Sequence, residues 1–173
     1  MQIGKTGMQW SLFAGQVAGM LSIVPMFMYA TATQWAIAGA MYFGIMTFGL
    51  TMGYHRYLSH SYFKCPKWFE LVMLFFAHIM MVGPAILWVA THRAHHKYSD
   101  TNEDPHDMNK GFWWSHIGWM FVDVPAEKEA YRYTADLRKD SYFRWLDKYF
   151  LLLQIPLGFF LFSFDLIDYF FYI

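Results

Sequence analysis

Three of the eight histidines in this 173-residue chain fall within five positions, in the string HRAHHKYSD. On a helix, His92, His95 and His96 lie within an arc of about 100° on one face, so all three side chains can point at one small volume. Neutral imidazole is a good ligand for iron, copper, zinc or nickel. Three imidazoles that converged without a metal would repel one another once protonated. The cluster therefore predicts a metal site.

A second pair of histidines, His55 and His60, lies in the string HRYLSH. On a continuous α-helix these side chains would be about 140° apart around the helix axis. Either the helix breaks near Ser59, or the two imidazoles approach a metal from two sides. Taken alone, the pair fits an anchor at an interface as well as it fits a ligand pair.

The remaining histidines carry less chemistry. His78 and His116 are isolated on apolar stretches, where a histidine is usually a hydrogen-bonded core or interface residue, and His106 lies in the loop-like string NEDPHD. The single cysteine, Cys65, excludes a cluster of thiolate ligands. Any metal here is therefore expected to be held by nitrogen or oxygen.

The composition indicates that lipid is part of the solvent. Hydrophobic residues make up 57% of the chain, aromatic residues 22% and charged residues only 15%, against about 25% charged residues in an average soluble domain. The formal net charge is +0, so no general attraction to nucleic acid is expected.

Three stretches are candidate membrane spans. Residues 8–30 and 35–54 carry no charge, and each is long enough to cross about 30 Å of hydrocarbon as a helix. These two would form a hairpin. Residues 149–164 are a shorter third candidate, followed by aromatic residues typical of an interface.

Positive charge predicts the orientation of these spans. Twelve of the 13 lysines and arginines lie between Arg56 and Lys148, and basic loops usually face the cytoplasm. We therefore expect an all-α integral membrane protein with a single domain, residues 1–173, in which a helical hairpin and a third span carry a histidine-rich cytoplasmic cap, residues 55–148.

The apolar stretch 71–90 conflicts with that topology if it crosses the bilayer. A crossing would place His55 and His60 about 30 Å from the second histidine cluster, too far to share a metal. The pair Gly83-Pro84 and the lone His78 also argue against a straight helix facing lipid. We expect this stretch to dip into the cytoplasmic leaflet or lie against it.

Taken together, HRYLSH and HRAHHKYSD resemble the first two histidine boxes, HxxxxH and HxxHH, of the membrane fatty acyl desaturases. The longer strings GYHRYLSHSYF, THRAHHKYSDTNEDPHD and GFWWSHIGWMF are most similar to the acyl-CoA delta-9 branch, including its bacterial members. The resemblance implies a four-span fold, a two-iron centre and O2-dependent insertion of a cis double bond into a saturated acyl chain. It assigns ligand roles to His55, His60, His92, His95 and His96.

The family also has a third box, close to HxxHH and beyond a fourth span, and this sequence contains no match to it. The resemblance therefore implies five ligands from this chain, an incomplete two-iron centre and no activity of the chain alone. An incomplete reading frame, half of a split enzyme and a natural short form that binds one metal are all consistent with this pattern.

Further residues are candidates for supporting roles. Tryptophans could line an acyl tunnel or anchor the cap at the interface: Trp113, Trp114 and Trp119. A carboxylate could orient a ligating imidazole, although a solvated loop is the simpler interpretation: Asp100, Glu103, Asp104 and Asp107. A basic face could contact anionic lipid, an acyl-CoA phosphate or an acidic electron carrier: Arg132, Arg138, Lys139, Arg144 and Lys148.

Two other functions stay open beside acyl desaturation. A lipid hydroxylase would use the same iron and O2 but leave a hydroxyl group on the chain. A non-catalytic membrane protein would bind metal or lipid, or pair with a homologue. By resemblance, the partners of the enzyme are a fatty acyl thioester or acyl lipid, O2, and a ferredoxin or cytochrome b5-like electron donor.

Overall fold

The computed structural model describes residues 5–99, 101–121 and 131–163, and within these ranges all regular secondary structure is helical. The elements are α1 Lys5–Tyr29, α2 Ala32–Gly44, η1 Ile45–Ser59, α3 Lys67–Ile79, α4 Ala85–Tyr98, η2 Met108–Lys110, α5 Phe112–His116, η3 Gly118–Phe121, η4 Tyr131–Thr134, α7 Ala135–Lys139 and α8 Ser141–Ser163. The predicted all-α class is confirmed for the described part of the chain.

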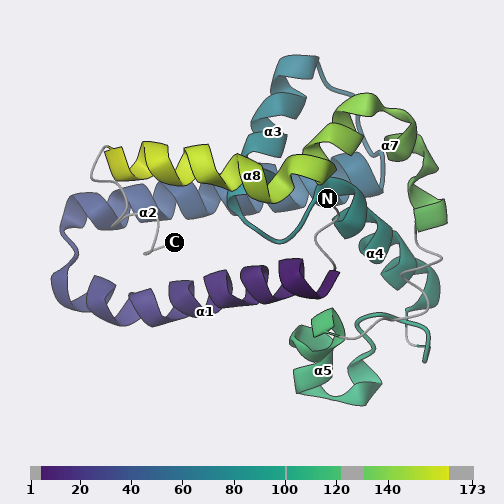
Figure 1. Ribbon diagram of the computed structural model, residues 1–173, viewed down its shortest axis with the longest axis horizontal. Coiled ribbons are helices and arrows are strands. Elements are labelled where there is room, and N and C mark those ends of the chain that lie inside the picture. The colour runs from purple at the N-terminus through teal and green to yellow at the C-terminus, as the bar shows by residue number, and fades with distance from the viewer. Residues whose placement is uncertain (1–4, 100, 122–130, 164–173) are drawn as a thin grey trace.

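The first two long helical arms form the predicted hairpin (Figure 1). Thr31 begins α2 with a capping box, because its hydroxyl accepts the N–H of Gln34 while the Gln34 side chain accepts the N–H of Thr31 at 2.7 Å. Two helices, Gln9–Tyr29 and Ala32–Ser59, are long and apolar enough to cross a membrane. They match the predicted spans 8–30 and 35–54, except that the second extends into the first histidine box.

The second arm changes its winding at Ile45. From there to Ser59 it is a π-helix, in which each N–H donates to the carbonyl five residues earlier instead of four. Glycines lie along its contact with α3: a Cβ built on Gly49 would be 2.8 Å from the backbone nitrogen of Ala77. The backbones of η1 and α3 therefore approach as closely as small residues allow.

The apolar stretch 71–90 is not one straight helix. α3 ends at Ile79 and α4 begins at Ala85, with Met81 and Gly83 at φ values of 53° and 118°. The carbonyl of Gly83 accepts a hydrogen bond from the buried Tyr54 hydroxyl at 3.2 Å. The break predicted at Gly83-Pro84 is present, and the position of this segment at a leaflet stays a prediction.

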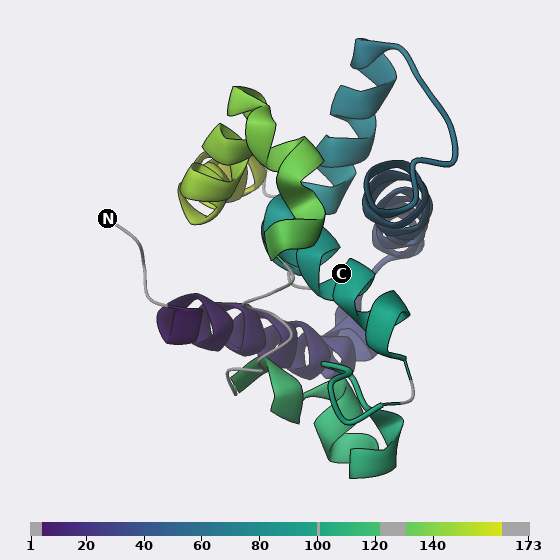
Figure 2. The same ribbon diagram turned by 90° about the vertical axis from the view of Figure 1, so that its right-hand side faces the viewer.

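The core unites both histidine-bearing helices with α3, α7 and α8. Its buried members include Tyr54 and Leu58 of η1, Val89 of α4 and Leu146 of α8. In Figure 1, α4 crosses at the end of the long helices that is farthest from the turn between α1 and α2, and this end faces the viewer in Figure 2. This crossing brings the end of η1 against α4.

Helix α1 lies largely outside this core. Most of its large apolar side chains are exposed, including Met20, Leu21 and Phe27, while Trp10 and Phe13 pack against Phe121. An exposed apolar face of this extent is typical of contact with lipid or another protein. The predicted third span, 149–164, falls on α8, and its last residue lies outside the described residues.

Asp147 of α8 fixes the start of α4. The side chain of Pro84, at the N-cap position, cannot accept a hydrogen bond. The carboxylate of Asp147, on α8, accepts the N–H of Ile86 instead, at 3.0 Å. Burial raises the pKa of Asp147 to about 7, although the backbone hydrogen bonds around Ile86 oppose the rise.

Replacing Asp147 by asparagine should remove part of the pH dependence of stability. Because the folded protein holds the Asp147 proton more tightly than the unfolded chain, this group's stabilising contribution is full below about pH 4 and lost as pH rises towards 7. Each unit of pKa shift corresponds to about 1.4 kcal/mol. Thermal unfolding in detergent at pH 5 and pH 7.5 should show a smaller loss in Asp147→Asn than in wild type. An equal loss in both proteins would contradict the assignment, and Asp140→Asn, at an exposed cap, serves as control.

Candidate metal centre

Four histidines from two helices converge at the crossing of η1 and α4. His55 and His60 come from the end of η1, and His92 and His96 come from α4. Each offers a ring nitrogen, and these four nitrogens all lie within 4.8 Å of one another. The Nε2 atoms of His92 and His96 are 3.0 Å apart. Among the described residues, this is the group whose geometry suits a single metal ion.

The winding of η1 aligns the first pair. The helix ends at Ser59 and His60 forms its C-cap, as the first alternative expected, but the π-type winding before that end is what aligns the two rings. The N–H of His60 donates to the carbonyl of His55 at 3.2 Å, five residues back. One π-type turn therefore separates the two imidazoles, and their ring centroids are 4.7 Å apart.

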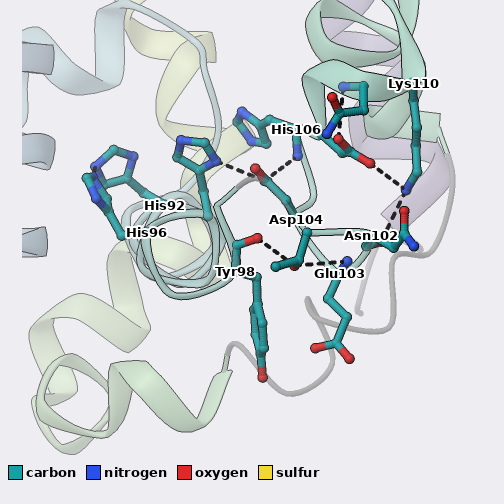
Figure 3. Close-up of polar contacts among 12 residues, drawn as sticks. His92, His96, Tyr98, Asn102, Glu103, Asp104, His106 and Lys110 are labelled. Atoms are coloured by element: carbon teal, nitrogen blue, oxygen red, sulfur yellow. Dashed lines mark hydrogen bonds and ion pairs between the residues drawn. The ribbon is translucent and has the colours of Figure 1, made fainter.

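On α4, the three clustered histidines divide into two groups. His92 and His96, four residues apart, lie together on the face towards η1 (Figure 3). His95 turns to Asp104, whose Oδ1 is 2.8 Å from its Nδ1 and also accepts the N–H of His106 at 2.8 Å. Asp104 is almost completely buried. It thereby fixes the ring of His95 and leaves Nε2 as the nitrogen available to a metal.

The protonation states suit ligation. Burial, followed by the charges of the neighbouring histidines, lowers the pKa of His92 to about 3. The same causes hold the pKa of His60 below its usual value. Both rings are therefore neutral near pH 7, with a lone pair free for a metal ion.

A cavity of about 270 Å³ adjoins the cluster. Its walls include Trp88 and His92 from α4, Leu12 from α1, and His106 and Trp119 from the segment after α4. The walls are mostly apolar, with polar groups at a few points, as is common for small-molecule sites. A largely apolar ligand in this cavity would lie at one edge of the histidine cluster, next to His92.

The three predicted tryptophans lie in different surroundings. Trp119 stacks on His106 with ring centroids 4.1 Å apart and faces the cavity, whereas Trp113 is exposed. Trp114 lies under the ammonium group of Lys110, with 5.0 Å from Nζ to its ring centroid. Only Trp119 of the three is placed to contact a ligand in this cavity.

The histidines predicted to be structural lie apart from the cluster of four. Nδ1 of His78 hydrogen bonds to the carbonyl of Leu74, and Nδ1 of His116 to that of Phe112. His106 is half-buried, and its Nε2 has no hydrogen-bond partner within the described part of the chain. Of the acidic candidates, Asp104 contacts a histidine ring, and Asp100 lies outside the described residues.

Sequence reasoning missed two residues that contact the site. The indole of Trp88 stacks on His92, with ring centroids 4.8 Å apart and 17° between the planes. In the sequence, Arg93 is one of twelve basic residues between Arg56 and Lys148, and nothing there indicates that it reaches from α4 to the end of η1. The position of Trp88, one helical turn before His92, is a signal that could have identified it.

The types of ligand atom in the cluster limit which metals it could hold. Four imidazoles without a thiolate suit iron, copper, zinc or nickel, and do not suit magnesium or calcium, which prefer oxygen ligands. Iron therefore fits the residues present.

Comparison with known proteins places these features in a family. The fatty acid desaturase family model matches residues 32–173. The chain is 45% identical over 115 residues to the sn-1 stearoyl-lipid 9-desaturase of Synechocystis sp., a match that covers 66% of this chain and 36% of that relative.

Two further relatives give the same result. The sn-1 stearoyl-lipid 9-desaturase of Anabaena variabilis is 43% identical over 72% of this chain and 47% of its own length. Delta-9 acyl-lipid desaturase 2 of Arabidopsis thaliana is 35% identical over 82% of this chain and 46% of its own length. The matches span between about a third and a half of these relatives. The resemblance seen in the histidine boxes is confirmed, and the chain belongs to the fatty acid desaturase family.

Proposed function

We propose that this chain forms part of an O2-dependent fatty acyl desaturase that introduces a cis double bond, at the delta-9 position, into a saturated acyl chain. The observation that carries the proposal is the convergence of His55, His60, His92 and His96 within 4.8 Å at the edge of a mostly apolar cavity. The relatives are named as 9-desaturases acting on stearoyl or acyl lipids, which supports an acyl lipid as the substrate.

The chemistry explains why a metal is required. A saturated methylene has neither an acidic proton nor a leaving group, and zinc has no redox chemistry with which to remove hydrogen. Iron with O2 supplies the oxidising power for this reaction. The four clustered histidines would hold one iron. His95, oriented by Asp104, would contribute to a second iron whose other ligands come from outside these five histidines.

The protein's own contribution would be positioning. The cavity beside His92 would hold a stretch of acyl chain, with Trp88 and Trp119 as rigid walls. Which carbons react would then depend on how far the chain reaches past His92, because a fixed approach geometry selects the reacting atoms. In the cell, the histidine-rich cap would face the cytoplasm, where a ferredoxin or a cytochrome b5-like protein would supply electrons.

Lipid analysis of cells that express the chain tests the proposal. The chain is expressed alone and together with the part of the Synechocystis relative that lies outside the matched region, to provide the third histidine box that the family resemblance implies. We expect a new cis-monounsaturated acyl chain only in the co-expressing cells, and its loss when this chain carries His92→Ala.

Each other outcome supports a different function. A hydroxylated acyl chain would favour the lipid hydroxylase. Iron bound through the histidines, with no altered lipid in either cell line, would favour a non-catalytic member of the family. The metal content of the purified chain, measured by elemental mass spectrometry after anaerobic loading with ferrous iron, separates the last result from a failure to bind iron.

A further inference from the structure

Arg93, next to His92 in α4, joins the two helices that carry the clustered histidines. Its Nε donates to the carbonyl of Ser59 at 2.9 Å, and its Nη2 donates to the carbonyl of Leu58 at 2.6 Å. Nη1 and Nη2 donate to the two carboxylate oxygens of Asp136, each at 2.9 Å, and Nη1 also donates to the carbonyl of Tyr133. The five N–H donors of a guanidinium group are all used.

Within the described part of the chain, no backbone N–H donates to the two η1 carbonyls that Arg93 contacts. The carbonyls of His55, Arg56 and Tyr57 accept the N–H groups of His60, Tyr62 and Ser61. The next two, on Leu58 and Ser59, accept from Arg93. A helix end leaves such carbonyls without partners inside the helix, so a side chain from α4 completes the last turn of η1.

This contact lies beside two histidines of the cluster. The carbonyl of Ser59 belongs to the peptide group that leads into His60, and Arg93 directly follows His92 in the chain. The ring centroids of His60 and His92 are 5.5 Å apart, and those of His60 and His96 are 4.7 Å apart. Arg93 therefore ties the backbone beside one ligand to the backbone beside another.

Asp136 holds the guanidinium group of Arg93 in one orientation through two parallel hydrogen bonds. The bidentate pair restricts the rotation of Arg93, so its remaining donors keep their direction towards η1. The Arg93 side chain is largely buried, at 19% relative exposure, while that of Asp136 is at 53%. The ion pair on its own would add little to stability where it is exposed to solvent. Its geometric effect on Arg93 is the larger consequence.

We propose that Arg93, held by Asp136, is a positioning residue that sets the distance of His60 from His92 and His96 and thereby determines the metal affinity of the cluster. The inference rests on the proposed metal centre. A residue that orients metal ligands from behind typically contributes about 10- to 100-fold to metal affinity.

Cobalt(II) titration of the detergent-purified full chain tests this role, with visible absorption reporting the coordination geometry and thermal unfolding measured on the same samples. We expect Arg93→Gln to weaken cobalt binding by about 10- to 100-fold. Arg93→Lys should restore affinity only in part, because an ammonium group cannot make the same planar set of contacts. Asp136→Asn should weaken binding less than Arg93→Gln, because the bonds from Arg93 to Leu58 and Ser59 remain.

Arg144→Gln is the matched control. Arg144 also donates to carbonyls at a helix end, with 2.9 Å from its Nη1 to the carbonyl of Lys139, but it lies on α8 and contacts no histidine of the cluster. Its loss should leave cobalt affinity unchanged even if the unfolding temperature falls. Equal losses of affinity in Arg93→Gln and Arg144→Gln would overturn the proposal.

The remaining outcomes separate this inference from the metal centre itself. Wild-type cobalt affinity in both Arg93→Lys and Asp136→Asn would also overturn the role of Arg93, even if Arg93→Gln fails to fold. If wild-type protein bound no cobalt, or if His92→Ala bound it as tightly as wild type, the metal centre would be contradicted and not merely the role of Arg93.

Discussion

Replacing His96 by alanine is expected to remove metal binding from the four-histidine cluster. The Nε2 of His96 is 3.0 Å from that of His92, so both nitrogens point at the same volume, and the cluster has four donors in all. The affinity for cobalt or ferrous iron should fall by more than about 100-fold, since a residue that only supports a ligand already contributes 10- to 100-fold. Titration by visible absorption, together with elemental analysis after anaerobic loading, measures this loss.

Two other histidine variants serve as controls for the loss of metal binding expected in His96→Ala. His116→Ala should keep the wild-type affinity, because His116 stacks on Phe112 and hydrogen bonds to its carbonyl, apart from the cluster of four. His95→Ala should keep the first metal equivalent, because the His95 ring is held by Asp104 and is not among the four converging nitrogens. Comparable losses in all three variants would contradict the assignment of ligands.

The division between His95 and His96 illustrates what spacing alone can predict. The arc of about 100° on one helical face correctly indicated that His92 and His96 lie together. The direction of His95 depends on Asp104, nine residues later in a loop, and on its burial. Loop conformation has no periodicity from which such a contact could be predicted.

The winding of η1 escaped prediction for a different reason. A spacing argument assumes 3.6 residues per turn, and no residue type in HRYLSH marks hydrogen bonds that span five residues. His55 and His60 consequently seemed misaligned on a helix that in fact brings them together. Sequence identified the right pair by residue type and could not supply its geometry.

Contacts between distant helices were also beyond the sequence. Asp147, on α8, hydrogen bonds to the first turn of α4, and Arg93, on α4, hydrogen bonds to the last turn of η1. Each residue thus satisfies backbone groups at the end of a different helix. In the sequence each is one charged residue among several. The apolar runs and the Gly83-Pro84 break, by contrast, depend on local composition, and the structure has helices and a break at those places.

Close packing of η1 on α3 leads to the second large expected effect, the destabilisation caused by Gly49→Ala. The added Cβ would lie 2.8 Å from the backbone nitrogen of Ala77 and 2.8 Å from the carbonyl carbon of Phe76. These are backbone atoms of α3, which cannot rotate aside as a flexible side chain would. The helices must separate, and overpacking of this kind costs about 1–3 kcal/mol.

Gly39→Ala provides the matched control for that substitution. Gly39 lies in α2 on the same helical arm, and a Cβ there would meet no described atom within 4 Å. Because alanine favours a helix over glycine by up to about 1 kcal/mol, this variant should be as stable as wild type or slightly more stable. Thermal unfolding of both variants in detergent measures the difference, and equal unfolding temperatures would contradict the close contact at Gly49.

The same pair of variants links packing to the metal centre. Gly49 precedes His55 by less than two turns of η1, and α3 leads through the break at Gly83 into α4 and its histidines. Moving α3 away from η1 should therefore shift the two halves of the cluster relative to one another. We expect cobalt affinity to fall in Gly49→Ala and to stay unchanged in Gly39→Ala, because only the first substitution changes the distance between the helices that bring the ligands together.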